Sequence, residues 1–434
     1  MNLADFIVQH QNDDISDLVL HRDRYPDVDV ALAAECIAAR RKLRYKVPEW
    51  YADAELICPV ALSAEQCSST ATARYKAAVA EEACRLPLEA IREEQRARPC
   101  PVKGPRSGHC SSASLQPALP TSLRIADLTG GLGVDCWQFS RIADSVLYNE
   151  MNPVLLDAAR HNLPRLGCTN VIFSGLQIGP DNLPGLLDGF RPDLVFADPA
   201  RRAGNGRKVF LPEDCMPDIL SMQDMILDRG MALMVKLSPM ADISLMLKKF
   251  HHASGLHIVQ SDGECKELLL ICRPDFDAET LITVADAVCG PLFSFVPSEA
   301  SRAVPALTGV SPDSGRFLFE PGPALAKSGA FNLLCKRFAI KSLGASAHLF
   351  IADSPLPQLE KAGKWFRIAQ TAPFGKAAMK EFASKWPDAE LSARAMPLGS
   401  DSLKDKMGLR GGGPVHIFAA GSAAGRLLIA AYRI

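Results

Sequence analysis

The chain has 434 residues, a formal net charge of −1, and ordinary shares of hydrophobic and charged residues, 48% and 22%. This length exceeds one compact core, and at about 150 residues per domain it predicts about three folded units. The composition excludes a disordered chain. The near-zero charge excludes a polycation, so any contact with nucleic acid must come from a local basic face.

The 13 cysteines include no Cys-x-x-Cys pair. An odd number without metal-type spacing predicts reduced thiols, no metal site and a cytoplasmic location. The N-terminus lacks a basic stretch followed by an apolar run, and no apolar stretch is long enough to span a bilayer. We therefore expect a soluble protein with no secretory signal and no membrane partner.

Residues 1–97 have the texture of helices. The basic run Arg40–Lys46 either contacts a phosphate backbone or forms the solvated face of a helix, and the sequence leaves both open. A capping-box pattern at Ser63 predicts a further helix that continues toward Cys84. The segment 98–122 is rich in proline, glycine and serine and predicts a linker.

From residue 123 to 274, short apolar runs alternate with helical segments. This alternation predicts βαβ units and a largely parallel, doubly wound sheet, that is, a Rossmann-like α/β domain. The candidate strands are Arg124–Leu128, Val146–Asn149, Val171–Phe173, Leu194–Ala197, Ala232–Val235, Leu256–Val259 and Leu268–Cys272. Seven strands in this length fit one sheet.

Beyond Pro274 the pattern is less regular and predicts two small α+β units, a ferredoxin-like one at 275–345 and a second one at 346–434. A helix is expected at Lys376–Lys385, and the strand-like pieces are Leu292–Val296, Phe317–Phe319, His348–Ile351, His416–Ala419 and Leu427–Ala431. The segment from residue 341 to the end has 13 Lys or Arg and 7 Asp or Glu, which leaves −7 for the rest of the chain. This concentration of basic charge suits a polyanionic partner.

A glycine-rich turn follows the first strand of the α/β domain. From Asp127 the chain reads Asp-Leu-Thr-Gly-Gly-Leu-Gly-Val-Asp. Glycines let the backbone approach a ligand there, and the helix that follows offers unpaired N–H groups. A dinucleotide and S-adenosylmethionine are the two common ligands of such a turn. Cys136 replaces the third glycine of the dinucleotide pattern, and Asp127 suits the ammonium group of the methyl donor.

An acidic residue closes the next strand. Glu150 lies about 20 residues after the glycines, where a carboxylate accepts hydrogen bonds from both hydroxyls of a ribose. Met151 would then lie against the adenine face. Enzymes that bind NAD share this acid, so the glycine pattern and the residues after Glu150 decide between the two ligands.

Those residues resemble a known family. The segment 150–153 reads Glu-Met-Asn-Pro and is followed by Ala158-Ala159-x-x-Asn162, which looks like class I methyltransferases that act on RNA. The resemblance covers residues 123–273 and implies S-adenosylmethionine as the cofactor. Gln177 stands where the family has an acid near the adenine. By similarity, the cofactor-binding residues are Asp127, Thr129, Gly130, Gly131, Gly133, Asp135, Glu150, Met151 and Gln177.

The tract 196–202 reads Phe-Ala-Asp-Pro-Ala-Arg-Arg at the end of the fourth strand. Methyltransferases that act on exocyclic amines of bases carry Asp-Pro-Pro and an aromatic residue at this place. Here Ala200 and Arg201 replace the second proline and the aromatic residue. The resemblance makes Asp198 and Pro199 the catalytic residues that orient the acceptor amine, with Asp198 also a candidate base.

Three cations near this tract are candidate substrate-binding residues. Arg201 and Arg202 would stack on a base or bind a phosphate, or else form salt bridges with local acids. Lys236 ends a buried strand and would either reach an acceptor phosphate or extend to solvent. Methylation of a pyrimidine carbon needs a cysteine nucleophile after this strand, and Ser238 is there instead, which disfavours that reaction.

The whole chain, including Gln66-Cys67-Ser68-Ser69 and the Gly-Gly-Gly-Pro segment at 411–414, is similar to a bacterial group of methyltransferases with a THUMP-like C-terminal domain. That group is likened to trimethylguanosine synthases, which methylate the cap guanine of RNA. The resemblance implies methylation of structured RNA, with a guanine exocyclic amine as a candidate acceptor, and a helix near Gln66 and Ser69 that covers the methionine pocket. Two alternatives stay open: a protein or small-molecule methyltransferase, and a catalytically silent RNA-binding protein. The sequence predicts no oligomeric state.

Overall fold

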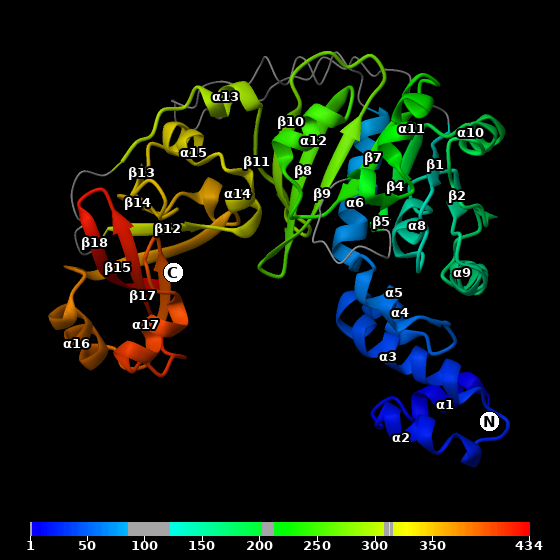
Figure 1. Cartoon of the computed structure of the whole chain (residues 1–434), viewed down its shortest axis with the longest axis horizontal. Helices are drawn as coiled ribbons and strands as arrows, with labels where there is room; N and C mark the ends of the chain where they lie inside the picture. Colours follow the sequence, from blue (N-terminus) through cyan, green and yellow to red (C-terminus); the bar gives the residue numbers. More distant parts are fainter. Residues whose placement is uncertain (1, 86–121, 202–211, 308–311, 313–315) are drawn as a thin grey trace, which may run out of the picture. The chain divides into compact units, whose positions relative to one another are not determined.

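The computed structural model describes residues 2–85, 122–201, 212–307, 312 and 316–434 (Figure 1). It divides into two compact units. The first holds the described residues up to 256 together with 267–280, and the second holds 257–266 and the described residues from 281 onward. The predicted linker lies outside the described residues except for Ser122. Within the described ranges, no helix has both the length and the apolarity that crossing a membrane requires.

The N-terminal region of the first unit is helical, as predicted. Its helices are α1 (Leu3–Gln9), α2 (Ile15–Leu20), η1 (Arg22–Arg24), α3 (Val30–Lys46), α4 (Pro48–Ala52), α5 (Ala61–Gln66) and α6 (Thr70–Arg85). The expectation of one helix from Ser63 toward Cys84 is wrong. The chain is extended at Cys67, and the Ser69 hydroxyl accepts the N–H of Thr72 at 3.2 Å, so a new capped helix starts there.

The sheet whose parallel strands all lie in the first unit confirms the predicted doubly wound α/β architecture. Seven strands run in the order β8-β9-β7-β4-β1-β2-β3 within a sheet of nine. They are β1 (Arg124–Asp127), β2 (Ser145–Asn149), β3 (Val171–Ser174), β4 (Leu194–Ala197), β7 (Ala232–Leu237), β8 (Ala253–Ser261) and β9 (Glu264–Cys272). All seven strands predicted from the sequence are present. The strands β1, β2, β3, β4 and β7 are parallel, and β9 is antiparallel to β7.

Burial of the central strands explains why their positions could be predicted from the sequence. All four residues of β4 are buried, and five of the six in β7, which is what helices on both faces of a parallel sheet produce. The helices that follow the strands are α8 (Val134–Phe139), α9 (Pro153–Arg165), α10 (Leu183–Phe190), α11 (Ile219–Leu227) and α12 (Ile243–Lys249). A short pair, β5 (Ala200–Arg201) and β6 (Cys215–Met216), and the turn η2 (Pro212–Asp214) lie between β4 and α11.

The second unit contains the hairpin β10 (Leu281–Asp286) and β11 (Gly290–Phe295) and a sheet of seven strands. In order, that sheet consists of β13 (Lys341–Ser342), β14 (Phe350–Ala352), β12 (Phe317–Pro321), β15 (Gly363–Pro373), β18 (Gly425–Arg433), β17 (Val415–Ser422) and β16 (Glu390–Arg394). The helices are α13 (Pro297–Ser301), α14 (Pro323–Ser328), α15 (Phe331–Phe338), η3 (Pro357–Leu359), α16 (Lys376–Lys385) and α17 (Ser400–Met407). Strands from both sides of residue 345 share this sheet, and the domain boundary predicted there stays a prediction.

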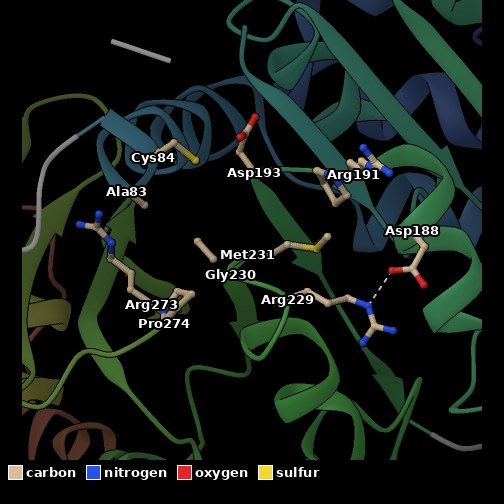
Figure 2. A pocket seen from close by; sticks show the side chains of 12 residues that line it. Ala83, Cys84, Asp188, Arg191, Asp193, Arg229, Gly230, Met231, Arg273 and Pro274 are labelled. Carbon is tan, nitrogen blue, oxygen red and sulfur yellow. Dashed lines mark hydrogen bonds and ion pairs between the residues drawn. The ribbon is translucent and has the colours of Figure 1, made fainter. Parts of the chain in front are cut away.

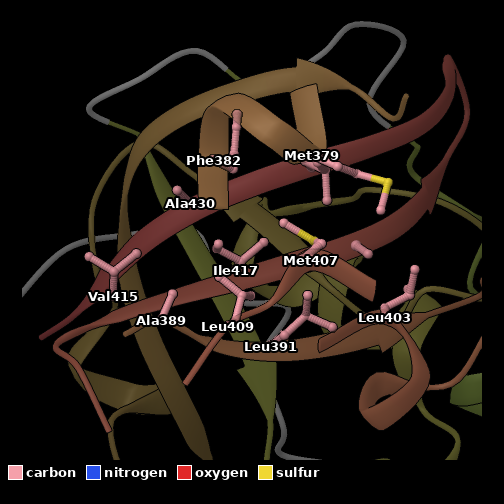
Figure 3. Packing of buried hydrophobic residues seen from close by; sticks show 12 residues of the cluster. Met379, Phe382, Ala389, Leu391, Leu403, Met407, Leu409, Val415, Ile417 and Ala430 are labelled. Atoms are coloured by element: carbon pink, nitrogen blue, oxygen red, sulfur yellow. The ribbon is translucent and has the colours of Figure 1, made fainter. Parts of the chain in front are cut away.

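A compact apolar core joins α16 and α17 to this sheet (Figure 3). Phe382 of α16 and Leu403 of α17 are completely buried, as is Ile417 of β17. Each such side chain contributes about 1.5–3 kcal/mol by leaving water. The predicted helix at Lys376–Lys385 is therefore confirmed with its packing partners identified.

Candidate active site

The glycine turn between β1 and α8 has the backbone that its sequence predicted. Gly131 and Gly133 have φ values of +54° and +96°, which side chains rarely tolerate. A Cβ added to Gly130 would lie 2.1 Å from a ring atom of Tyr148, and that ring is completely buried. The Tyr148 hydroxyl donates to the carbonyl of Gly131 at 2.6 Å. The turn is thus fixed in place beside the end of β2.

Asp127 supplies a buried carboxylate next to this turn. It is 1% exposed, and its Oδ1 accepts the N–H of Thr129 at 3.0 Å. Its Oδ2 is buried and has no hydrogen-bond partner among the described residues. Burial raises the pKa of Asp127 well above its usual value, and the carboxylates of Asp135, Asp198 and Glu150 raise it further. A cationic group placed against Oδ2 would therefore donate a hydrogen bond to this oxygen, and the surrounding carboxylates would stabilise its positive charge.

Glu150 faces the same turn from the end of β2. Its Oε2 accepts the N–H of Gly131 at 2.8 Å, and its Oε1 accepts the N–H of Asn152 at 2.8 Å. Each carboxylate oxygen can accept more than one hydrogen bond, so both retain capacity for ribose hydroxyls. The two backbone bonds hold the carboxylate beside the glycine turn, and its role toward a ribose stays a prediction.

Asn149, which the sequence analysis did not identify as a site residue, links the end of β2 to the segments that follow β1 and β3 by hydrogen bonds. Asn149 is 1% exposed; its amide donates to the carbonyls of Leu128 and Leu176, and its Oδ1 accepts the N–H of Leu176. Met151 and Leu176 are 51% and 40% exposed, so apolar surface lies at the ends of β2 and β3. Gln177 is exposed there as well. These features suit the face of an adenine ring.

Asp198 and Lys236 form an ion pair at the ends of β4 and β7. The Lys236 Nζ lies 2.5 Å from the Asp198 Oδ2, and the N–H of Asp198 donates to the Thr129 hydroxyl at 2.7 Å. Burial alone would lower the pKa of Lys236, but the carboxylates of Asp198, Glu267 and Asp135 raise it above its usual value. Thr129 therefore connects the glycine turn to a charged pair in which the lysine stays protonated.

A second charge cluster, which was not predicted, surrounds Lys76 and includes Glu267 and Asp135. Lys76 of α6 is 0% exposed, and its Nζ donates to both carboxylate oxygens of Glu267 at 3.0 Å and to the Ser68 hydroxyl at 2.8 Å. The same Nζ lies 3.2 Å from Asp135, and Ser68 donates to Asp135 at 2.9 Å. No sequence motif marks Lys76, because its neighbours in the helix are mostly small residues and its partners are distant along the chain.

The helices before β1 contact the α/β domain through an aromatic pair and through hydrogen bonds. Trp50 of α4 meets Trp137 of α8 edge to face at 6.0 Å between ring centroids. Asn162, part of the sequence motif, exchanges two hydrogen bonds with the backbone of Ile57. Of the two residues expected over the methionine pocket, Ser69 caps α6, and the Gln66 contact stays a prediction. The neighbouring Ser68 is the residue that reaches α8.

Most cationic side chains of the basic run Arg40–Lys46 form hydrogen bonds or ion pairs within the protein. Arg40 is 5% exposed and donates to two backbone carbonyls, and Arg41 donates to two others. Lys46 donates to carbonyls at the end of α5. The Lys42 ammonium is 3.4 Å from a carboxylate oxygen of Glu65. These contacts favour a structural role for the run over a phosphate-binding one.

The structure describes two of the three remaining predicted site residues, Pro199 and Arg201. Pro199 follows Asp198, and the backbone of Arg201 pairs with β6 in the short strand β5. Arg202 lies outside the described residues. The roles given to these three residues stay predictions.

A cavity of about 600 Å³ lies elsewhere in the first unit (Figure 2). Asp193 and Ala232, which line it, stand at the starts of β4 and β7, and Arg273 follows β9. Arg229 on its rim donates to Asp188 at 2.9 Å. The glycine turn and Asp198 lie at the opposite, carboxyl edge of the parallel strands, where ligands of open α/β sheets bind. The cavity is therefore separate from the candidate active site.

Comparison with known proteins agrees with this architecture. The chain is 22% identical over 307 residues to a protein of Mycobacterium tuberculosis, strains CDC 1551 and H37Rv, described as an uncharacterised S-adenosylmethionine-dependent methyltransferase. The match covers 70% of this chain and 78% of that protein. A crystal structure from Porphyromonas gingivalis W83, named only as a candidate methyltransferase, has 25% identity and a TM-score of 0.79. It covers 99% of this chain and 97% of that one.

A ferredoxin-like domain family matches residues 317–359. This confirms a ferredoxin-like part in the C-terminal region, and it falls across the boundary predicted at residue 345. The THUMP-like assignment of 346–434 stays a prediction.

Proposed function

We propose that this chain is an S-adenosylmethionine-dependent methyltransferase whose acceptor is an exocyclic amine of a base in RNA. The enzyme class and the cofactor predicted from the sequence are confirmed by the relatives in M. tuberculosis and by the P. gingivalis structure. The RNA acceptor and the roles of individual residues are our proposal.

The observation that carries the cofactor assignment to these residues is the buried Oδ2 of Asp127, which has no hydrogen-bond partner among the described residues and lies beside a turn whose positive φ angles favour glycine. The methionine part of the cofactor carries an ammonium group, which would give this oxygen its missing donor. Glu150 would accept from the ribose hydroxyls, and Met151 would contact the adenine. The residues present therefore fit the cofactor.

When bound, the cofactor supplies a methyl group activated by its sulfonium, and the protein has little covalent chemistry to perform. Asp198 would accept a hydrogen bond from the acceptor amine and orient its lone pair toward the methyl group. Lys236 holds the Asp198 carboxylate in place through the ion pair at 2.5 Å. The hydroxyl of Thr129 fixes the backbone of Asp198 relative to the glycine turn. Positioning by these groups supplies the acceleration.

Three features support RNA as the acceptor. The Asp-Pro that follows β4 matches the place where amine methyltransferases hold a base. The region from residue 341 onward has an excess of basic over acidic residues, 13 to 7, which suits a phosphate backbone. The resemblance to methyltransferases that act on RNA points the same way.

The test is transfer of a labelled methyl group from S-adenosylmethionine into total cellular RNA by the full chain. We expect label in RNA, at least a hundredfold less with Asp198→Ala, and unchanged cofactor affinity in that variant by calorimetry. Asp228→Ala, a surface change after α11, is the matched control. Label in the protein or small-molecule fraction, with none in RNA, would overturn the acceptor. Absence of cofactor binding to the wild-type chain would overturn the enzyme class.

A further inference from the structure

Glu267 lies close to two lysines, the fully buried Lys76 and the partly buried Lys236. Its side chain is bonded to Lys76, and the register of β9 on β7 places it near Lys236 as well. Lys236 pairs with Leu269, and in a strand Glu267 shares the face of Leu269. Such diagonal neighbours on one sheet face are about 7–8 Å apart. Glu267 is thus a carboxylate between two ammonium groups.

The charge of Lys236 depends on all the groups around it. Besides Glu267 of β9, the titratable groups that interact with it are Asp198 after β4, Asp135 of α8 and Cys67 of the α5–α6 turn. Lys76 of α6 shares two of these carboxylates, Glu267 and Asp135, with Lys236. Asp198 and Asp135 favour the protonated lysine, and so does Glu267, whereas the ammonium of Lys76 opposes it. Without the Glu267 charge, Lys76 would keep Asp135 as its carboxylate partner among the described residues, and Asp135 is a carboxylate on which Lys236 also depends.

We propose that Glu267 is a positioning residue of the active site. By neutralising Lys76 and facing Lys236, it keeps Lys236 protonated and bonded to Asp198, so that Asp198 stays a fixed hydrogen-bond acceptor. The importance of that acceptor rests on the proposed function, whereas the coupling of charges among these residues is measurable without any acceptor or cofactor.

The experiment measures how fast Lys236 is acetylated by trace acetic anhydride in the full chain. Only the neutral amine reacts, so at a fixed pH below the pKa the rate rises tenfold for each unit by which the pKa falls. A charge 7–8 Å away in a medium of effective dielectric about 20 shifts a pKa by more than one unit. We expect Glu267→Gln to speed the acetylation of Lys236 at least tenfold at pH 9, read by mass spectrometry against exposed Lys361.

Two further variants separate charge from structure. Glu264→Gln lies on the same strand but is exposed and paired with Lys266, so acetylation of Lys236 should stay at the wild-type rate. The double variant Glu267→Gln/Lys76→Met also removes the positive charge that Glu267 balances, and it should return the Lys236 rate to within about threefold of wild type. A merely loosened fold would label the double variant at least as fast as the single one.

Three results overturn the proposal: a wild-type rate in Glu267→Gln, a double variant that reacts as fast as the single one, or an equal effect of Glu264→Gln. If Glu267→Gln does not fold, Lys76→Met alone decides, because loss of the neighbouring ammonium must slow the acetylation of Lys236. Calorimetry with S-adenosylmethionine runs in parallel. A wild-type chain that binds no cofactor but shows the expected rates defeats the proposed function and leaves the charge coupling standing. Normal binding with unchanged rates defeats this inference alone.

Discussion

Replacement of Asp127 by asparagine should have two opposite effects, a loss of cofactor affinity and a gain in the stability of the ligand-free protein. The variant Asp127→Asn keeps the shape of the side chain and the acceptor for the N–H of Thr129. It removes the negative charge and puts an N–H₂ group at the position of Oδ2, the atom without a partner among the described residues. If the cofactor ammonium binds there, the variant loses a charge-assisted hydrogen bond, which contributes about 1.5–3 kcal/mol. The expected loss of cofactor affinity is therefore about 10- to 150-fold.

The stability of the ligand-free protein should change in the opposite direction. Burial raises the pKa of Asp127 in the folded state, so the folded protein binds this proton more tightly than the unfolded chain does. The wild type accordingly loses unfolding free energy from this group as the pH rises above the unfolded pKa of about 3.9. Asparagine does not titrate. The difference in unfolding free energy, variant minus wild type, should grow between pH 4 and pH 7.

Isothermal calorimetry and urea unfolding at several pH values measure the two quantities. Asp144→Asn is the matched control, because Asp144 also accepts a backbone N–H, that of Leu123, but lies at the opposite end of the strands. It should leave cofactor affinity within twofold of wild type. Cofactor affinity that is equal in Asp127→Asn and wild type would refute the placement of the ammonium, and a stability difference independent of pH would refute the electrostatic account of Asp127.

Three further outcomes follow from the same contacts. Gly130→Ala places a methyl group against the buried ring of Tyr148 and should cost about 1–3 kcal/mol of unfolding free energy in urea titrations; a neutral result would mean that the ring moves freely. Ser68→Ala removes the hydroxyl between Lys76 and Asp135 and should cost about 1–2 kcal/mol, whereas the exposed Ser16→Ala should cost nothing measurable. RNA affinity, measured by filter binding, should fall linearly in a plot of log K against log salt, and a flat line would contradict contacts to phosphates.

Six of the seven strands of the α/β domain were predictable because of how they are buried, whereas β3 has no buried residue. Strands such as β4 are covered on both faces, so each is written as a continuous apolar run between turn residues. In the second unit, β15 (Gly363–Pro373) was missed because it mixes buried and partly exposed residues along its length without clear alternation. The position of Asp127, Glu150 and Asp198 at one edge of the sheet followed from the rule that parallel strands end on the same side.

The charge cluster of Lys76 could not be predicted from the sequence, because its members are far apart along the chain. Lys76 and Glu267 are 191 positions apart, and each alone reads as an ordinary charged residue. The break between α5 and α6 was missed because Ser63 offered a good cap, whereas the chain is extended at Cys67 and Ser69 caps a new helix. The turn between them also contacts a distant element, through the hydrogen bond of Ser68 to Asp135. Local patterns predict elements, but contacts across the chain fix where those elements end.

Those same contacts explain how the N-terminal helices come to complete the site. A buried ion pair adds little net stability, because the cost of removing two charges from water offsets most of their attraction. A wrong arrangement is penalised heavily, since it leaves a charge buried without its partner. Lys76 is satisfied only when α6 lies where Ser68, Asp135 and Glu267 converge. The cluster therefore selects one placement of α6 against α8 and β9, and that placement brings the turn before α6 to the first turn of α8, beside the glycine turn.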